Sequence, residues 1–292
     1  MPTIRTVKPL LETPLLTLGE FRCPPEDDAW RETNTIGDRP HVVFPRTTVL
    51  IEQEGRPPVL ATPAHAILYN AQQLYRRGLR TEVGDDAVFV ALPPESLEPL
   101  AAAGARLVNT DNRLVASHAP ADRRAYLLQH VLVRYLHVPH PDPLLAEEAA
   151  GSLVLHTLGS ADVPRTRQAG RSRQAHRELA EAAKAELAAD PGRSLTLEQL
   201  GRLLHTSAFH LARVFRAETG FSLHGFRRTL RVRAGLERLS SNANDLTALA
   251  LELGFSSHSH FSERFRNEFG VAPSQVRDDG RIRALLEAAV RG

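Results

Sequence analysis

The sequence has one cysteine and no long apolar run. A lone Cys23 excludes an internal disulfide and a cage of thiolate ligands around a metal ion. No apolar stretch approaches the roughly 20 residues that cross a bilayer. The first 20 residues contain no apolar segment followed by a cleavage site of small residues. We therefore predict a reduced, cytoplasmic protein that neither spans nor binds a membrane.

Motifs of common catalytic sites are also missing. There is no phosphate-binding loop and no glycine-rich dinucleotide fingerprint after a strand. The segment Gly220–Gly225 has one residue too many for a nucleophile elbow. His65 lacks the nearby histidine and glutamate of a metal-binding cupin, and two histidine pairs lack further ligands, namely His137/His140 and His258/His260. We expect no enzyme activity, no cofactor and no bound metal.

Positive charge comes almost entirely from arginine, because Lys8 and Lys184 are the only lysines. The net charge of +2 hides an asymmetry: residues 1–165 carry 16 Lys+Arg against 20 Asp+Glu, and the remainder carry 20 against 14. Arginine suits bidentate contacts to phosphate and guanine, although a GC-rich genome produces the same bias. The basic C-terminal part favours a polyanionic partner for that part alone.

A chain of 292 residues is long enough for two domains. Short β-branched segments recur in its first 120 residues, with turn-forming clusters between them, and Asp85-Asp86 after Gly84 is interpreted as such a turn. The expected strands are His41–Phe44, Thr47–Ile51, Ala66–Tyr69 and Ala87–Leu92. This rhythm predicts an antiparallel β-sandwich or small barrel. A small molecule inside it would contact Trp30, Phe44, Arg46, Tyr69 and Phe89, whose alternative role is core packing.

Two helices are predicted after the sandwich, over Asp122–His137 and Pro143–Leu158. The first carries a continuous apolar stripe over Leu127–Tyr135. That stripe packs against the sandwich or forms the interface of a homodimer. Residues 161–173 are rich in Gly, Ser, Pro and Arg and predict a linker between a domain of residues 1–160 and one of residues 174–292.

The last third of the chain repeats itself. Thr196–Gly220 and Asp245–Gly270 align with an offset of 49 residues that becomes 50 after the turn. Each copy predicts a short helix behind an N-cap, a brief turn, and a longer helix from a serine N-cap to a glycine. Apolar residues recur every four positions in the longer helices, which leaves the opposite face polar. A short helix across a longer one with a hydrogen-bonding outer face is a helix-turn-helix layout.

These residues resemble the AraC/XylS family of transcriptional regulators. Ala250–Arg277 (ALELGFSSHSHFSERFRNEFGVAPSQVR) follows the family signature, from Gly254-Phe255 through Phe261 and Phe265 to Pro273. The resemblance implies two helix-turn-helix units, 196–220 and 245–270, joined by a helix over 222–239 whose core side would hold Phe226, Leu230, Val232, Leu236 and Leu239. It also implies a cupin-like N-terminal domain, and hence an α+β protein with an all-α C-terminal domain.

Three residues depart from the family pattern. Glu263 stands where an arginine usually reads bases, Gly235 replaces an alanine inside the joining helix, and Val276 replaces an aromatic residue. A carboxylate accepts a hydrogen bond from cytosine N4, so Glu263 changes the expected base preference of the second unit.

The resemblance further implies the partners and the contact residues. The partners are double-stranded promoter DNA, RNA polymerase, a small-molecule effector and a second copy of the chain. Arg213 would read a guanine edge, Phe209 a thymine methyl group, and the N-termini at Ser207 and Ser257 would face phosphate. The full set of expected DNA contacts is Ser207, Phe209, His210, Arg213, Arg216, Arg227, Arg231, Ser257, His258, Ser259, Ser262, Glu263 and Arg266.

Two alternatives come from other classes of protein. In the first, the β-domain is a cupin-type enzyme and the helices are an accessory module; the missing metal-ligand spacing disfavours it. In the second, the helical repeat binds protein rather than nucleic acid; a steep salt dependence of DNA binding would exclude it.

Overall fold

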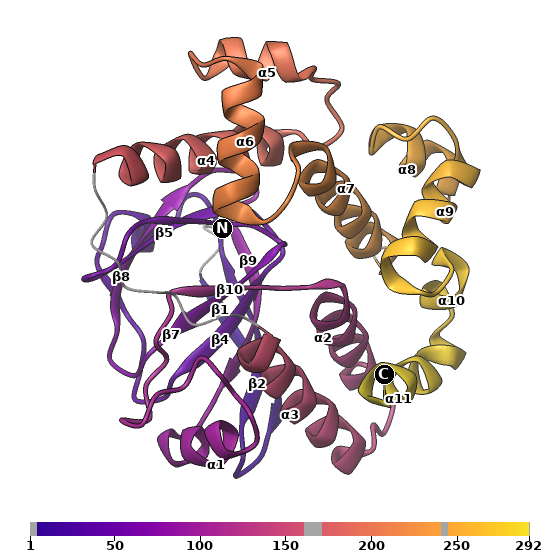
Figure 1. Cartoon of the computed structure of the whole chain (residues 1–292). Coiled ribbons are helices and arrows are strands. Elements are labelled where there is room, and N and C mark those ends of the chain that lie inside the picture. Colours follow the sequence, from indigo (N-terminus) through magenta and orange to yellow (C-terminus); the bar gives the residue numbers. More distant parts are fainter. Residues whose placement is uncertain (1–4, 161–170, 241–244, 292) are drawn as a thin grey trace. The chain divides into compact units, whose positions relative to one another are not determined.

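The computed structural model describes residues 5–160, 171–240 and 245–291, which fall into two units (Figure 1). The first unit comprises residues 1–164 and 274–292, and the second comprises residues 165–273. Residues 274–292, expected in the C-terminal domain, therefore belong with the first unit. The predicted linker 161–173 lies mostly outside the described residues, and its last three residues start helix α4 (Arg171–Ala189).

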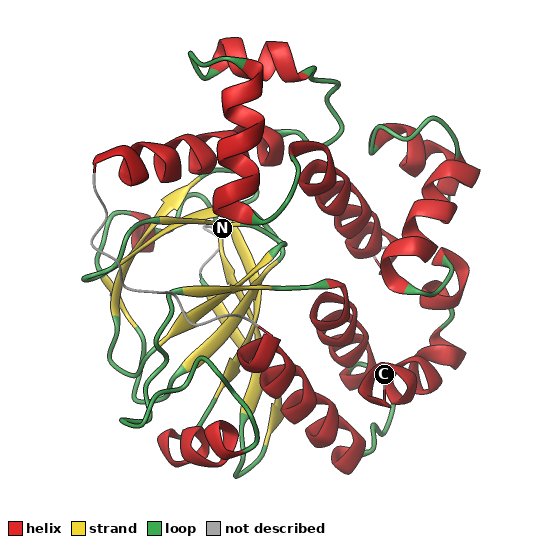
Figure 2. Ribbon diagram, in the orientation of Figure 1, coloured by secondary structure: helices red, strands yellow, loops and turns green. Residues whose placement is uncertain are grey.

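The first unit is built on an antiparallel β-sandwich, as predicted (Figure 2). One sheet has the strand order β1-β2-β9-β4-β7-β10 and the other β3-β8-β5-β6. The larger sheet contains β1 (Thr6–Glu12), β2 (Thr17–Cys23), β9 (Asp85–Ala91), β4 (His41–Pro45), β7 (His65–Tyr69) and β10 (His118–Pro120). The smaller sheet contains β3 (Asn34–Thr35), β8 (Leu74–Leu79), β5 (Val49–Gln53) and β6 (Val59–Ala61).

All four expected strands are present, as β4, β5, β7 and β9, within two residues of their predicted bounds. The interpretation of Asp85-Asp86 as a turn was wrong. Both residues belong to β9, where Asp85 pairs with Cys23 and Asp86 with Arg22, and the turn ends at Gly84 with a φ of 80°. Asp is rare in strands, so its presence predicted a turn. The pairing with β2, which lies more than 60 residues earlier in the chain, places both residues in the sheet.

The larger sheet is covered on both faces along its inner strands β9, β4 and β7, whereas β1 at its edge is largely exposed. Alternate residues such as Val42, Phe44 and Leu68 join a core with helices α2 (Arg123–Leu136), α3 (Pro143–Ser160) and α11 (Ile282–Arg291). The intervening residues, among them Ile67 and Tyr69, face the smaller sheet in a second core. The period of two along each strand separates the cores.

Helix α2 begins where Asp122 caps the Ala125 amide at 2.9 Å, as the sequence predicts. Its apolar stripe is buried within the first unit, since Leu128, Val131 and Leu132 have no exposed surface. Helix α11 contacts both α2 and α3. The proposal that this stripe forms a dimer interface is therefore wrong, because the chain covers it with its own C-terminal helix.

The second unit contains the repeat as two helix pairs. The first pair is α5 (Leu197–Leu203) and α6 (Ala208–Thr219), and the second is α8 (Leu246–Glu252) and α9 (His258–Phe269). Helix α7 (Leu223–Ser240) joins them, contacts both α6 and α9, and buries the five apolar residues expected in its core side. In the part of the chain that the structure describes, no helix is long and apolar enough to cross a membrane.

Candidate nucleic-acid interface

The two helix pairs have the same backbone construction. In the first turn, the Thr206 amide donates to the Gly201 carbonyl at 2.9 Å; in the second, the Phe255 amide donates to the Ala250 carbonyl at 2.9 Å. The serine N-caps expected from the sequence are present: Ser207 accepts from the His210 amide and Ser257 from the His260 amide. Both longer helices end at a glycine with a φ of 75°, Gly220 and Gly270.

Helix α6 turns an aromatic and basic face to solvent. The Phe209 side chain is 89% exposed, so it does not close the core. Arg213 and Arg216 are exposed on the same helix, and Arg213 Nη2 lies 3.3 Å from His210 Nδ1. The His210 ring also meets His176 of α4 at 5.6 Å between ring centroids. The outer face of α6 therefore carries two exposed arginines and the exposed ring of Phe209.

Helix α9 presents a smaller, more neutral face. Ser259, Glu263 and Arg266 are exposed, while His258 Nε2 lies 3.2 Å from the Ser262 hydroxyl. The opposite side buries three phenylalanines, as the repeat predicts, namely Phe261, Phe265 and Phe269. The departure from alanine at Gly235 of α7 has a steric reason, because a Cβ at that position would lie 2.7 Å from the Phe261 ring.

Two arginines of α7 that the sequence predicts as DNA contacts hold loops within the second unit. Arg231 donates through Nη1 to the Gly254 carbonyl (3.0 Å) and through Nη2 to the Gly192 carbonyl (3.1 Å). Arg227 donates through Nη1 to the Leu195 carbonyl at 3.1 Å. These acceptors lie 23 to 39 residues away in the chain, so the sequence pattern alone could not reveal them. Arg231 thereby joins the loop before α5 to the turn between α8 and α9.

The N-terminal half of α7 is strongly basic. The pKa of His224 is lowered by burial and then by the charges of four arginines around it, Arg228, Arg227, Arg231 and Arg264. Arg264 comes from α9 and the other three from α7, so the cluster spans the joining helix and the second helix pair. Such a concentration of positive charge favours an anionic partner.

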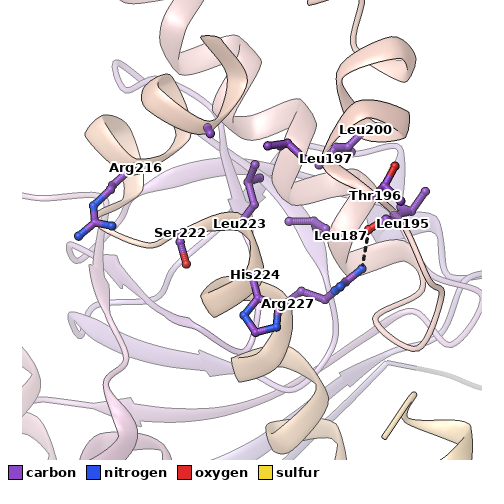
Figure 3. Close-up of a pocket in the computed structure, with 11 residues that line it drawn as sticks. Leu187, Leu195, Thr196, Leu197, Leu200, Arg216, Ser222, Leu223, His224 and Arg227 are labelled. Carbon is purple, nitrogen blue, oxygen red and sulfur yellow. Dashed lines mark hydrogen bonds between the residues drawn. The ribbon is translucent and has the colours of Figure 1, made fainter. Parts of the chain in front are cut away.

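An open groove of about 440 Å³ lies beside this cluster, between α4, α5, α6 and α7 (Figure 3). Leucines line its wall, including Leu187, Leu200 and Leu223, and Arg216 and Arg227 stand at its edge. The groove is the incompletely closed apolar core of the first helix pair.

The first unit holds a cavity of about 160 Å³ between its two sheets. Of the five expected ligand contacts, Tyr69 and Phe89 line it. The other three do not: Phe44 faces the helices, Arg46 pairs with Glu20 at 2.8 Å, and Trp30 packs at the border of the second core with its indole N–H on the Pro24 carbonyl.

Two charged residues of this cavity escaped the sequence analysis, Arg77 of β8 and Asp85 of β9. Their guanidinium and carboxylate groups lie 3.2 Å apart. A signal was present, because a strand over 74–79 places Tyr75 and Arg77 on one face. Strand β8 was not predicted, so that signal was not used.

Comparison with known proteins identifies the helical repeat as a helix-turn-helix domain. Residues 200–279 match a family described as "Helix-turn-helix domain". The HTH-type transcriptional regulator MtrA of Neisseria gonorrhoeae is 29% identical over 84 residues, which cover 29% of this chain and 28% of that protein. The multiple antibiotic resistance protein MarA of Escherichia coli is 31% identical over 83 residues, covering 28% of this chain and 65% of that protein.

The chain spans less than a third of the length of the first curated relatives that it matches. Among solved structures, ToxT of Vibrio cholerae covers 91% of this chain at 11% identity with a TM-score of 0.38. An AraC-type regulator of Chromobacterium violaceum covers 36% of the chain at 23% identity with a TM-score of 0.34. The matched region is a helix-turn-helix domain, and relatives that share it, such as MtrA, are named as transcriptional regulators.

Proposed function

We propose that the protein is a sequence-specific DNA-binding transcriptional regulator of the AraC/XylS type, which inserts α6 and α9 into adjacent major grooves. The observation that carries the proposal is the repeated helix pair, in which both longer helices bury an apolar side and expose a polar one. Helix α7 contacts both of them and supplies the basic cluster around His224. A recognition helix needs this combination of a fixed scaffold and an exposed hydrogen-bonding face.

Each recognition helix has its own contacts. Arg213 reads a guanine edge and Phe209 packs on a thymine methyl group, while His210 and Arg216 contact phosphate. On α9 the readers are His258, Ser259, Ser262 and Glu263, with Arg266 alongside. The amide groups that follow Ser207 and Ser257 face phosphate at the two helix N-termini. Arg227 and Arg231 act indirectly, by holding the loops that orient the helices.

The first unit controls this activity, by binding a small molecule or by pairing two chains on two half-sites. The cavity between its sheets offers a place for an effector. The α2 stripe is not available for pairing, so a dimer uses another surface. Sedimentation of the full chain with and without DNA measures the pairing. RNA polymerase is the partner through which promoter binding acts on transcription.

Footprinting on DNA upstream of the chain's own gene and of neighbouring genes tests the proposal. We expect two protected major-groove segments per chain, separated by about one helical turn of 10 base pairs. The matched control is unrelated DNA of the same length, together with a salt titration that separates phosphate contacts from base contacts. Protection of one groove segment only, or equal protection of unrelated DNA, would contradict the insertion of two helices.

A further inference from the structure

The cavity between the two sheets has the size and lining for one ring. Its volume of about 160 Å³ is close to that of an engineered cavity of about 150 Å³ that binds benzene. Aromatic side chains from four strands line it, namely Phe21, Tyr69, Tyr75 and Phe89. Aromatic rings pack well against such walls in edge-to-face or offset arrangements. The shape and lining therefore favour a planar, monocyclic ligand.

A buried cation stands in this aromatic cavity. The Arg77 side chain is 3% exposed, and its guanidinium carbon lies 4.6 Å from the Phe21 ring centroid and 5.3 Å from that of Tyr75. Nη1 donates to Asp85 at 3.2 Å and Nη2 donates to the Tyr75 hydroxyl. Among the described residues, nothing accepts from the buried Nε.

This unmet donor points to the chemistry of the ligand. Nε and Nη2 form one edge of the planar guanidinium, and a carboxylate accepts from both groups of such an edge. A buried N–H of a charged group is strongly destabilised without an acceptor. A ligand carboxylate on this edge satisfies Nε and replaces the weaker hydroxyl partner of Nη2.

We propose that the cavity binds a small planar carboxylate with one aromatic ring, placing the ring among Phe21, Tyr69 and Phe89 and the carboxylate on the Nε–Nη2 edge of Arg77. The assignment of this ligand as the effector rests on the proposed function; the binding site itself does not.

Asp85 adds a second property to the site. Burial raises its pKa to about 6, since the loss of hydration outweighs the attraction of Arg77. A ligand carboxylate beside Asp85 raises that pKa further, so binding takes up a proton above about pH 6. The other titratable groups acting on Asp85 are Arg77 and Tyr75 of β8, Asp86 of β9, Cys23 of β2 and Tyr69 of β7. Affinity for a carboxylate is therefore expected to tighten as the pH falls from about 8 to about 6.

Calorimetric titration of the full chain tests the site with benzoate, its neutral analogue benzamide, and acetate, which lacks the ring. We expect saturable benzoate binding at least about tenfold tighter than either comparison compound, because only benzoate fills the ring space and pairs with Arg77. Benzamide binding as tightly as benzoate, or no saturable benzoate binding to the folded chain, would overturn the proposal.

Variants separate the cavity from the surface. Val43→Phe fills the cavity from β4 and should abolish benzoate binding, whereas Val83→Phe lies on a turn where the native side chain is 70% exposed and should bind as the parent does. Arg77→Lys retains the charge but loses the flat edge, and should lower benzoate affinity about tenfold or more. Melting curves establish that each variant is folded. Unchanged benzoate affinity in folded Val43→Phe would place the ligand elsewhere and refute the cavity site.

DNA binding measured without benzoate keeps the two proposals distinct. If the chain protects DNA but binds no benzoate, the cavity proposal fails and the regulator proposal stands. If it binds benzoate in this cavity but no DNA, the cavity proposal stands and the regulator proposal fails. A benzoate-dependent change in DNA affinity that disappears in Val43→Phe identifies the ligand class as the effector.

Discussion

The two helix-turn-helix units share a backbone and differ in nearly every exposed side chain. Their turns close with the same hydrogen bond, and their longer helices start and end with the same caps. The outer face of α6 carries Phe209, Arg213 and Arg216, and that of α9 carries Ser259 and Glu263. The comparison teaches that capping and apolar spacing define the scaffold, while the surface is free to diverge. We expect the first helix-turn-helix unit to supply more DNA affinity and the second helix-turn-helix unit more hydrogen-bond selectivity.

The cores of the two helix-turn-helix units differ too. In the second helix-turn-helix unit, Phe265 packs edge-to-face with Phe261 at 5.6 Å and with Phe269 at 4.8 Å between ring centroids. In the first helix-turn-helix unit, Phe215 packs edge-to-face with Phe226 of α7 at 5.6 Å. The turns also differ at one position: His205 adopts a φ of 52° where Gly254 adopts 76°. A non-glycine residue in this region is strained.

The largest expected effect comes from the cores. Phe265→Ala and Phe215→Ala each remove a fully buried ring and should lower the free energy of unfolding by about 3–5 kcal/mol. Phe265→Ala should be the worse by roughly 1 kcal/mol, because it loses one more ring pair. Denaturant titration followed by circular dichroism measures both variants against the parent. A larger loss for Phe215→Ala would refute the idea that the three packed phenylalanines stabilise the second helix-turn-helix unit more than the first.

Exchanging the residue types at the left-handed position should destabilise the second turn and leave the stability of the first turn nearly unchanged. Gly254→Ala places a Cβ 2.7 Å from the Gly192 carbonyl and 2.8 Å from the Arg231 guanidinium. Its strained φ and this clash should lower the free energy of unfolding by about 2–3 kcal/mol. His205→Gly relieves strain but loosens the unfolded chain, so it should change stability by less than about 1 kcal/mol.

Thermal melts of the two turn variants provide the measurement. Equal destabilisation by both variants would show that the second helix-turn-helix unit does not require glycine at its left-handed position. Footprinting of Gly254→Ala adds a second readout, because displacing Arg231 should disturb the placement of α9.

The recognition faces should separate in DNA binding. Arg213→Ala should weaken specific binding by roughly 1–3 kcal/mol and relax the preference at one base pair. Glu263→Gln should weaken it less, and should move the preference at its base pair from cytosine towards adenine. Affinities for a set of single-base variants of the footprint measure both changes. A uniform loss across all sequences for Arg213→Ala would mean that Arg213 contacts phosphate.

The smallest expected effect is at the caps. Ser207→Ala and Ser257→Ala each remove the hydroxyl that accepts from the amide of the third helix residue, at 3.2 Å and 3.1 Å. Each should lower the free energy of unfolding by about 1 kcal/mol. Because the caps are equivalent, the two losses should agree within about 0.5 kcal/mol. A loss of stability at one cap alone would show that the two helix-turn-helix units are not equivalent.

The helix pairs were predictable because their signals are local. A cap acts within three residues and an apolar face within four, so Thr196, Ser207, Asp245 and Ser257 mark their helices in the sequence itself. Strands β4, β5, β7 and β9 were predictable from β-branched runs. Strands β1, β2 and β8 were not, since they carry prolines, glycines and charges, and β1 is also largely exposed.

The sequence alone specifies the duplicated helix pair, its caps, its core positions and the outward residues of α6 and α9. The contacts between residues far apart in the chain are defined only in the packed fold. Arg231 meets carbonyls from two loops, Arg77 meets Asp85 across neighbouring strands, and the α2 stripe is covered by a helix that begins at Ile282. Local signals come from interactions a few residues apart, whereas a buried charge or an apolar stripe has no defined partner until the chain has packed.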